Sequence, residues 1–459
     1  MNNNHIKHSF CITGTVSAIL LFLGFIPDKI TDKLGVRHID ILSDIRRDSA
    51  SNGAQSEWRQ PVLLPAPLDA AEIPCPPGMV CFDDFSSEGN GLANFFRALD
   101  NRSKHTVRIA FFGDSYIEGD IFCGDLRTFL QNEFGGKGAG MIMPTSHVAS
   151  FRRTVKHAFG GWNSQSLVDQ NRDVAKLGVA GNVFIPNKNA WVKYSGVKIS
   201  NLEFFSQASL IYLSESEASL LYRINETGTP KTVTLKASPG VSRYDIVADS
   251  IENIRIDFLS GNINVYGISL QDKTGVVVDN FSLRGAPGTS LKYLPEKILR
   301  QTDSLLNYNL IILQYGLNVM TANNTNYAFY QKGMKETIEH LRKCFPKSDI
   351  MLLSVGDRSM KKAGNYVTMP AVPALVEAQK AACAETGAVF WNLFEAMGGN
   401  ASMIDMVGAK PPRANKDYTH LNFEGGKYLG EILFKTFVFE KKKFDMTGQK
   451  KKKQTKKNR

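Results

Sequence analysis

The sequence predicts an α/β protein whose parallel-sheet domain is interrupted by a smaller antiparallel β-domain. Strand-like and helix-like segments alternate before residue 160 and again after residue 280. Such alternation is typical of a parallel sheet covered by helices on both faces. Between residues 160 and 280 the helical period is absent, and short alternating apolar and polar runs recur about every ten residues. We therefore expect a three-layer α/β/α domain with an inserted antiparallel β-sandwich.

Length and composition indicate a folded chain with an almost neutral body. The 459 residues are 43% hydrophobic and 22% charged, which excludes a mostly disordered chain, a collagen-like repeat and a polytopic membrane protein. The net charge is +11, and residues 441–459 hold nine lysines and Arg459 against one acid, Asp445. This tail alone carries +9, so the other 440 residues carry +2. A near-neutral body does not favour nucleic acid as a partner.

Residues 1–30 have the layout of a signal peptide or a signal-anchor. Lys7 precedes an uncharged, largely apolar run at 10–26, whose 17 residues would form a helix of about 25 Å. No small-x-small cleavage site follows Phe25, which favours an uncleaved anchor and leaves a cleaved signal peptide as the alternative. Both readings place Lys7 in the cytoplasm and the body outside it, in the periplasm or on the cell surface.

Residues 31–85 are expected to form a linker or stalk, because the stretch is rich in Pro, Asp and Ser. Near its end Cys75 and Cys81 flank a Pro-Pro-Gly turn, and in an oxidising compartment they could close a small disulfide loop. Two isolated buried thiols are the alternative. The cysteines and the eight scattered histidines show no metal-ligand spacing, so neither a metal nor a cofactor is predicted.

The first part of the α/β domain is predicted at residues 86–159. A short amphipathic helix is expected at 92–99, followed by a strand at 107–112 that is apolar except for Arg108. The spacing of apolar residues then predicts a helix at 125–134.

The inserted β-sandwich is predicted at residues 160–280. Turn clusters rich in Gly, Asn and Ser separate its short strands, as at 254–258 and 263–266. Its aromatic side chains could stack on sugar rings, although aromatic residues of a β-sandwich more often belong to the core. The aromatic candidates are Trp191, Tyr194, Phe204, Phe205, Tyr212, Tyr222, Tyr244 and Tyr266.

The second part of the α/β domain is predicted at residues 281–440. Residues 441–459 are then expected to be a solvated, disordered basic tail, with docking on an anionic lipid or polymer surface as the functional alternative. The expected strands of the second part are 310–313, 350–355 and 389–393, and the expected helices are 327–344, 372–385 and 423–437.

Polar side chains follow several of these strands. Ser115 comes directly after the strand at 107–112, and Asn318 follows the strand at 310–313. Asp417 and His420 lie in the loop before the last helix. Ligands of doubly wound sheets bind beyond the carboxyl ends of the strands, so we expect these side chains to gather in one site.

The residue types suit nucleophilic catalysis by an activated serine. A serine hydroxyl needs a base, and His420 is the candidate because histidine is the usual base near neutral pH. Asp417, three residues earlier, can accept the Nδ1 proton and fix the tautomer of the ring. Asn318 could donate a side-chain N–H to a developing oxyanion, and Gly288 could bring a backbone N–H to the same point.

The order of these motifs resembles the SGNH branch of the GDSL esterases and lipases. Four blocks carry the resemblance, and the Gly-x-Ser-x-Gly elbow of α/β-hydrolases is missing. By resemblance, Ser115 is the nucleophile, His420 the base and Asp417 its orienting partner. The oxyanion donors would be the backbone N–H groups of Ser115 and Gly288 and the Asn318 side chain, and Asp114, Gly285 and Gly316 would contribute to substrate binding. The blocks are Gly113-Asp114-Ser115, the loop with Gly285 and Gly288, Gly316-x-Asn318, and Asp417-x-x-His420.

Segments 113–120, 134–140 and 391–399 are also similar to the bimodular peptidoglycan O-acetylesterases. In that group a carbohydrate-binding-like β-domain interrupts the hydrolase between the serine and glycine blocks, as residues 160–280 would here. The resemblance implies an exported esterase that hydrolyses O-acyl, foremost O-acetyl, esters of a cell-wall or surface polysaccharide through an acyl-serine intermediate.

Two other functions stay open on the sequence alone. A polysaccharide O-acetyltransferase would use the same three residues and pass the acyl group to a sugar hydroxyl, beside a membrane acyl-transport partner. A glycan-binding protein would keep the fold without catalysis. The expected partners are an O-acetylated glycan, the cytoplasmic membrane through residues 1–30, and an anionic surface through the basic tail.

Overall fold

The computed structural model describes residues 73–457, with side chains up to residue 447. All of these residues belong to one unit of the chain, Leu64–Arg459. The apolar run at 10–26 and most of the predicted linker lie outside the described residues. Within residues 73–457, no helix is both long enough and apolar enough to cross a membrane.

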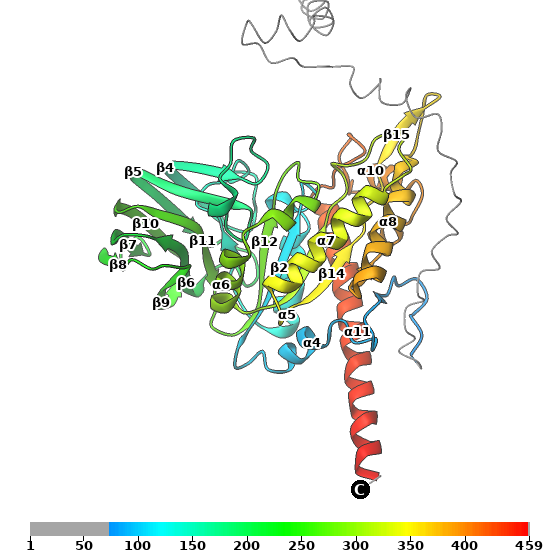
Figure 1. The fold of residues 1–459 in the computed structure, drawn as a ribbon, viewed down its shortest axis with the longest axis horizontal. Coiled ribbons are helices and arrows are strands. Elements are labelled where there is room, and N and C mark those ends of the chain that lie inside the picture. The colour runs from blue at the N-terminus through cyan, green and yellow to red at the C-terminus, as the bar shows by residue number, and fades with distance from the viewer. Residues whose placement is uncertain (1–72, 458–459) are drawn as a thin grey trace, which may run out of the picture. The chain divides into compact units, whose positions relative to one another are not determined.

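A mainly parallel sheet forms the centre of the α/β domain (Figure 1). Its order in the described chain is β1-β17-β14-β13-β2-β12, and only the edge strand β1 runs antiparallel to its neighbour. The five parallel strands, numbered by their order in the chain, lie in the order 2-1-3-4-5, which is the flavodoxin-like arrangement. The strands are β1 (Asp83–Asp84), β2 (Thr106–Gly113), β12 (Gly275–Ser282), β13 (Tyr308–Gln314), β14 (Asp349–Leu353) and β17 (Val389–Trp391).

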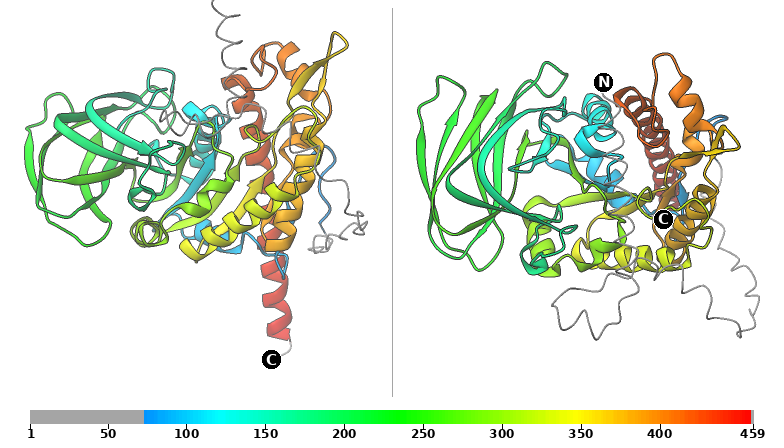
Figure 2. Two further views of the ribbon diagram at one scale, coloured as in Figure 1. Left: turned by 45° about the horizontal axis from the view of Figure 1, so that its top comes forward. Right: turned by 90° about the horizontal axis from the view of Figure 1, so that it is seen from above.

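Helices cover both faces of this sheet (Figure 2). Helices α4, α5 and α11 lie on one face, and α6, α7 and α8 lie on the other. Each packs an apolar stripe on the sheet, and this arrangement confirms the predicted α/β class. The helices are α4 (Ala93–Asp100), α5 (Cys123–Phe134), α6 (Glu296–Leu306), α7 (Ala328–Cys344), α8 (Ala371–Thr386), α9 (Leu393–Met397), α10 (Ser402–Gly408) and α11 (Phe423–Lys457), with short 3-10 turns η2 (Glu118–Asp120), η3 (Val174–Lys176) and η4 (Thr289–Tyr293).

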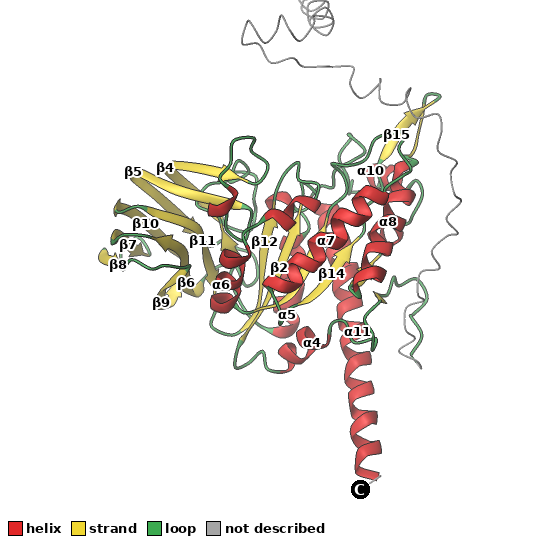
Figure 3. Cartoon of the chain, viewed as in Figure 1, coloured by secondary structure: helices red, strands yellow, loops and turns green. Residues whose placement is uncertain are grey.

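The inserted domain is an antiparallel β-structure built almost entirely of strands and loops (Figure 3). Its own apolar core is separate from that of the α/β domain. A small hairpin, β15 (Ser359–Lys362) and β16 (Asn365–Thr368), lies apart from both sheets. The strands of the inserted domain are β3 (Gly140–Ile142), β4 (Lys156–Ser166), β5 (Asn182–Ser195), β6 (Phe205–Ser214), β7 (Ala218–Ile224), β8 (Lys231–Leu235), β9 (Ser242–Ile251), β10 (Asn253–Ser260) and β11 (Ile263–Gln271).

The insertion begins and ends earlier than the sequence predicts. Strand β3, at 140–142, already pairs with β11 of the inserted domain. Strand β12, at 275–282, lies in the parallel sheet beside β2 and is therefore part of the α/β domain. The run Val276-Val277-Val278 is buried on both faces, as strands of a parallel sheet are, whereas the sequence analysis grouped it with the short antiparallel strands.

Four of the eight candidate sugar-stacking aromatic residues are buried in the core. Tyr194, Phe205, Tyr212 and Tyr266 are each at most 5% exposed, so their rings face protein and not solvent. Large aromatic side chains of a β-sandwich are more often buried in its core than exposed to a ligand.

A buried ion pair of the α/β domain makes hydrogen bonds to the inserted domain. Arg108 on β2 contacts Asp279 on β12 at 2.7 Å, and both side chains are buried. The same guanidinium donates to Ser269 on β11, while the Asp279 carboxylate accepts from the backbone N–H of Met141 on β3 at 2.8 Å. The carboxylate also accepts from the Tyr308 hydroxyl at 2.7 Å. A charge buried this deeply requires such partners, so the pair fixes the inserted domain against the central sheet.

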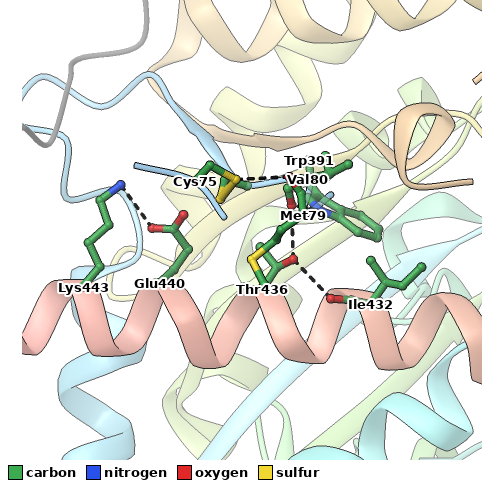
Figure 4. Close-up of a disulfide and its surroundings, with 9 residues drawn as sticks. Cys75, Met79, Val80, Trp391, Ile432, Thr436, Glu440 and Lys443 are labelled. Atoms are coloured by element: carbon green, nitrogen blue, oxygen red, sulfur yellow. Dashed lines mark hydrogen bonds and ion pairs between the residues drawn. A yellow bond between two sulfur atoms is a disulfide. The ribbon is translucent and has the colours of Figure 1, made fainter. Parts of the chain in front are cut away.

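Cys75 and Cys81 form a disulfide, which resolves the alternative left open by the sequence. The loop that it closes packs on the α/β domain (Figure 4). The Val80 carbonyl accepts hydrogen bonds from Trp391 Nε1 at 2.9 Å and from Thr436 Oγ1 at 3.1 Å. The end of the predicted linker is therefore attached to both β17 and α11.

We expect the double variant Cys75→Ser/Cys81→Ser to lose about 2 kcal/mol of unfolding free energy, because the unfolded chain regains the entropy of a short closed loop. Urea denaturation of both proteins measures the difference. Dithiothreitol should lower the stability of the wild type to that of the variant and leave the variant unchanged. Equal stability of wild type and variant under oxidising conditions would contradict this expectation.

Helix α11 continues well beyond Phe437, where the sequence analysis ends it. Residues 441–457 are helical in the structure, in place of the predicted disordered tail. Lys441 contacts Asp445 one turn later at 2.6 Å and Asp100 of α4 at 2.7 Å. Phe444 packs on Phe96, with ring centroids 5.5 Å apart. These contacts with α4 stabilise the part of the helix that lies beyond Phe437.

Candidate active site

Ser115, His420 and Asp417 form one hydrogen-bonded chain at the carboxyl edge of the sheet. Ser115 lies in the turn after β2, and its Oγ is 3.0 Å from His420 Nε2. His420 Nδ1 lies 2.8 Å from Asp417 Oδ2. A neutral ring that donates from Nδ1 to the carboxylate leaves Nε2 free to accept the serine proton. The structure thus brings together the three side chains that the sequence analysis selected.

The loop before α11 holds His420 in place through Asp417. The Oδ1 atom of Asp417 accepts hydrogen bonds from the backbone N–H groups of Thr419 and His420, both at 3.0 Å. Partial burial would raise the pKa of Asp417, but these hydrogen bonds outweigh it and hold the pKa below its ordinary value. The carboxylate therefore remains ionised and keeps its hydrogen bond to the ring.

Asp114 lies beneath the site and not in it. Its side chain is 0% exposed, so the expected direct contact with substrate does not fit this position. The carboxylate accepts from Tyr116 N at 2.9 Å and from Asn318 Nδ2 at 3.1 Å. Burial raises the pKa of Asp114 to about 6. Asp114 is better described as a positioning residue that holds the β13–α7 loop against the serine turn.

Replacing Asp114 with asparagine should lower kcat about 10- to 100-fold at pH 8, because an amide N–H₂ would face the donors that now point at Oδ2 and would displace Asn318. The ratio of wild-type to variant rates should shrink as the pH falls from 7 to 5, since the wild-type carboxyl protonates near pH 6 and becomes neutral like the amide. Steady-state rates across this range measure the effect. A ratio that is large and independent of pH would indicate a purely structural role.

Two backbone N–H groups are available to an oxyanion. Among residues 73–457, neither the Ser115 N–H nor the Gly288 N–H has a hydrogen-bond acceptor. Gly288 is buried at φ 84°, and a Cβ there would lie 2.6 Å from the Tyr315 ring, so the position requires glycine. An unpartnered N–H on a buried residue is costly unless a ligand accepts from it.

Asn318 is exposed at the site, but its amide is engaged. Nδ2 lies 3.1 Å from both Asp114 Oδ2 and the Ala286 carbonyl, and these acceptors use both of its hydrogens. To act as an oxyanion donor, as expected from the sequence, Asn318 must release one of these bonds when substrate enters. Gly285 is exposed at φ 80°, and no other atom lies within 4 Å of the position that a Cβ would take there. Gly316 is buried against Val355 and supports the loop from within the protein.

The β15–β16 hairpin adds a contact that sequence reasoning missed. Tyr366 stacks on Tyr418 with ring centroids 3.6 Å apart, and Tyr418 directly precedes the Thr419-His420 turn. The Tyr418 carbonyl also accepts from the backbone N–H of Ser359 at 3.0 Å. No local sequence pattern joins a short hairpin to a loop some fifty residues later, so only the fold reveals this support of the histidine loop.

No group of three or more metal-ligating side chains occurs in the described part of the chain. The polar side chains at the carboxyl edge are instead arranged as nucleophile, base and orienting acid. The fold and this arrangement define the class: an α/β protein with a serine-hydrolase type of site.

Comparison with known proteins supports this assignment of the fold. No family model and no curated protein matches the chain. The structure matches that of a peptidoglycan O-acetylesterase with a TM-score of 0.64 and 20% identity, over 79% of this chain and 99% of that chain. At this identity the match shows a common fold.

Two family two carbohydrate esterases are also similar, at TM-scores too low to carry an argument. The one from Cellvibrio japonicus has a TM-score of 0.26 and 9% identity, over 63% of this chain and 99% of that chain. The one from Clostridium thermocellum, in complex with cellohexaose, has a TM-score of 0.26 and 11% identity, over 61% and 99%.

Proposed function

We propose that this protein is an exported SGNH-type serine esterase that hydrolyses O-acyl, foremost O-acetyl, esters on a cell-wall or surface polysaccharide. The hydrogen-bonded chain from Asp417 through His420 to Ser115 carries the proposal. Support for an acetylated glycan as substrate comes from the fold shared with a protein described as a peptidoglycan O-acetylesterase.

The geometry supports acylation of Ser115. His420 Nε2 takes the hydroxyl proton as Oγ forms a bond to the ester carbonyl carbon. The carbonyl oxygen becomes an oxyanion, which the N–H groups of Ser115 and Gly288 can stabilise. The imidazolium, held by Asp417, then gives its proton to the departing sugar oxygen, so the sugar alcohol leaves and the acyl-serine remains.

Deacylation reverses the roles. His420 removes a proton from water, the hydroxide oxygen bonds to the acyl carbon, and Ser115 leaves with the proton returned to Oγ. The products are acetate and free enzyme. A sugar hydroxyl in place of water would give acetyl transfer instead, through the same intermediate.

We further propose that the described domains lie outside the cytoplasm, anchored by the apolar run at 10–26. The Cys75–Cys81 disulfide supports this placement, because structural disulfides form and persist in oxidising compartments. Protein taken from cells in the presence of an alkylating agent should react at neither cysteine until it is reduced. Alkylation of both without reductant would remove the support for export.

The experiment for the activity uses the full-length chain with an activated acetyl ester, with and without chito-oligosaccharide. Release of acetate to water that depends on Ser115 is the expected result. Acetylated oligosaccharide formed at the expense of free acetate would instead show a transferase. No Ser115-dependent turnover of any acetyl ester would overturn the catalytic proposal and favour a glycan-binding protein.

A further inference from the structure

A pocket of about 350 Å³ lies where the inserted domain meets the α/β domain. Its wall on the α/β side includes Glu118 of η2 and the segment Asn280–Arg284 at the end of β12. Side chains of the inserted domain form the opposite wall, Ser164 on β4 and Asn182 on β5 among them. The pocket is therefore built from both domains.

This pocket adjoins the candidate active site. Glu118 follows Ser115 by three residues, and Arg284 directly precedes Gly285 of the glycine loop. The Leu283 N–H donates to the carbonyl of Gly113 at 2.8 Å, which ties the pocket wall to the strand end that carries the serine. The pocket wall is thus formed in part by the same two segments that carry Ser115 and the glycine loop.

Arg152 is a nearly buried cation in the wall of this pocket. It lines the pocket, its side chain is only 9% exposed, and its Nε is buried without a hydrogen-bond partner among the described residues. The nearest carboxylate belongs to Asp120, whose Oδ2 is 3.8 Å from that Nε. This separation is too long for a hydrogen bond.

Asp120 already has other partners. Its carboxylate accepts from Arg127 NH1 at 2.9 Å and NH2 at 3.3 Å, from the Thr154 hydroxyl, and from Asn280 Nδ2 at 2.7 Å. Its pKa is held below the ordinary value, since the charges of Arg127 and Arg152 outweigh desolvation. One carboxylate thus faces two guanidinium groups, so the three side chains together carry one unbalanced positive charge.

The other charged groups of the pocket do not neutralise Arg152. Glu118 is paired with Arg284 at 2.6 Å. Asp169 is exposed at the rim, where its carboxylate accepts from the backbone N–H of Ser166 at 2.6 Å. The remaining titratable side chain of the lining is that of His147, which is exposed. Arg127 and Arg152 therefore share the single negative charge of Asp120, and this excess of buried positive charge favours an anionic ligand.

We propose that this pocket is a subsite for a carboxylate carried by the glycan substrate, with Arg152 as the residue that binds it. The planar guanidinium matches a carboxylate in shape and charge. Glu118 and Asp169 disfavour a dianionic phosphate more strongly than a monoanion. The Ser164 hydroxyl and the Asn182 amide offer partners for sugar hydroxyls. The inference rests on the proposed function, to which it adds the class of substrate: an acetylated acidic sugar.

The first test compares kcat/KM for O-acetylated glucuronic acid with kcat/KM for O-acetylated glucose, using the full-length chain. Arg152→Gln should lower the ratio of the two about 10- to 100-fold, as loss of a charge-assisted hydrogen bond does. Arg152→Lys should restore part of it. Arg300→Gln, which removes an exposed charge on α6, should leave the ratio unchanged. Both esters meet the same folded molecules, so partial unfolding does not alter the ratio. A ratio unaffected by Arg152→Gln would overturn the proposal.

The second test does not depend on catalysis. Ligand-observed NMR should detect binding of glucuronate to the wild-type chain, weaker binding of glucose 6-phosphate, and loss of glucuronate binding in Arg152→Gln. Glucuronate binding that persists in Arg152→Gln, or a preference for glucose 6-phosphate, would overturn the carboxylate subsite. If Ser115-dependent turnover is absent while Arg152-dependent binding is found, the proposed function fails and the subsite stands.

Discussion

Ser115→Ala is expected to lower turnover of an acetyl ester about 10⁴-fold or more, because no other group at the site can form the acyl intermediate. The Oγ of Ser115 lies 3.0 Å from His420 Nε2 and makes no other hydrogen bond within residues 73–457. Thermal unfolding of the variant should therefore match that of the wild type. Acetate release under saturating ester measures the loss in kcat.

Ser304→Ala provides the matched control for this variant. Ser304 is exposed on α6, and its hydroxyl donates to the Gln301 carbonyl within its own helix. The control should retain full activity. If Ser115→Ala kept more than about a hundredth of the wild-type rate while folded, the nucleophile would be a different group, and the assignment of the site would be wrong.

The elements around the site follow from local sequence patterns. The strand before Ser115 is a nearly continuous apolar run, and helix α7 has apolar residues at helical spacing, so both are predicted within about two residues of their ends. The order of parallel strands also places Ser115 and Asn318 at the switch point between β2 and β13. Local patterns thus predict where the site lies in the fold.

Other features depend on partners far away in the chain. From its sequence, β12 is predicted to be one more short strand of the inserted domain. In the structure it pairs with β2, more than 160 residues earlier, and so belongs to the parallel sheet. Helix α11 extends past Phe437 because Lys441 and Phe444 meet α4, which lies over 300 residues upstream. A single sequence carries no signal for either contact.

The same limit applies to the site residues. The Gly-Asp-Ser motif identifies Asp114 but does not show that its carboxylate is buried under the loop that carries Asn318. Arg152 lies in no motif. Only the fold shows that Arg152 shares the Asp120 carboxylate with Arg127 and Asn280.

Asp417→Asn is expected to lower kcat about 10²- to 10³-fold. Asparagine can keep the Oδ1 contacts to the Thr419 and His420 N–H groups, so the loop should hold its conformation. Its Nδ2 would face His420 Nδ1 and force the tautomer that carries a proton on Nε2, which cannot accept from Ser115. Asp405→Asn, an exposed position on α10, is the control and should be fully active.

The size of this loss distinguishes two roles for the carboxylate. A fully buried acid in a catalytic triad is worth about 10⁴ in rate, but the Asp417 side chain is 48% exposed, and water screens part of its interaction with the imidazolium. Orientation and tautomer control do not depend on screening, so most of the effect should persist at high salt. A loss that disappears at 1 M salt would show that Asp417 acts only through its charge, and full activity of Asp417→Asn would remove it from the site altogether.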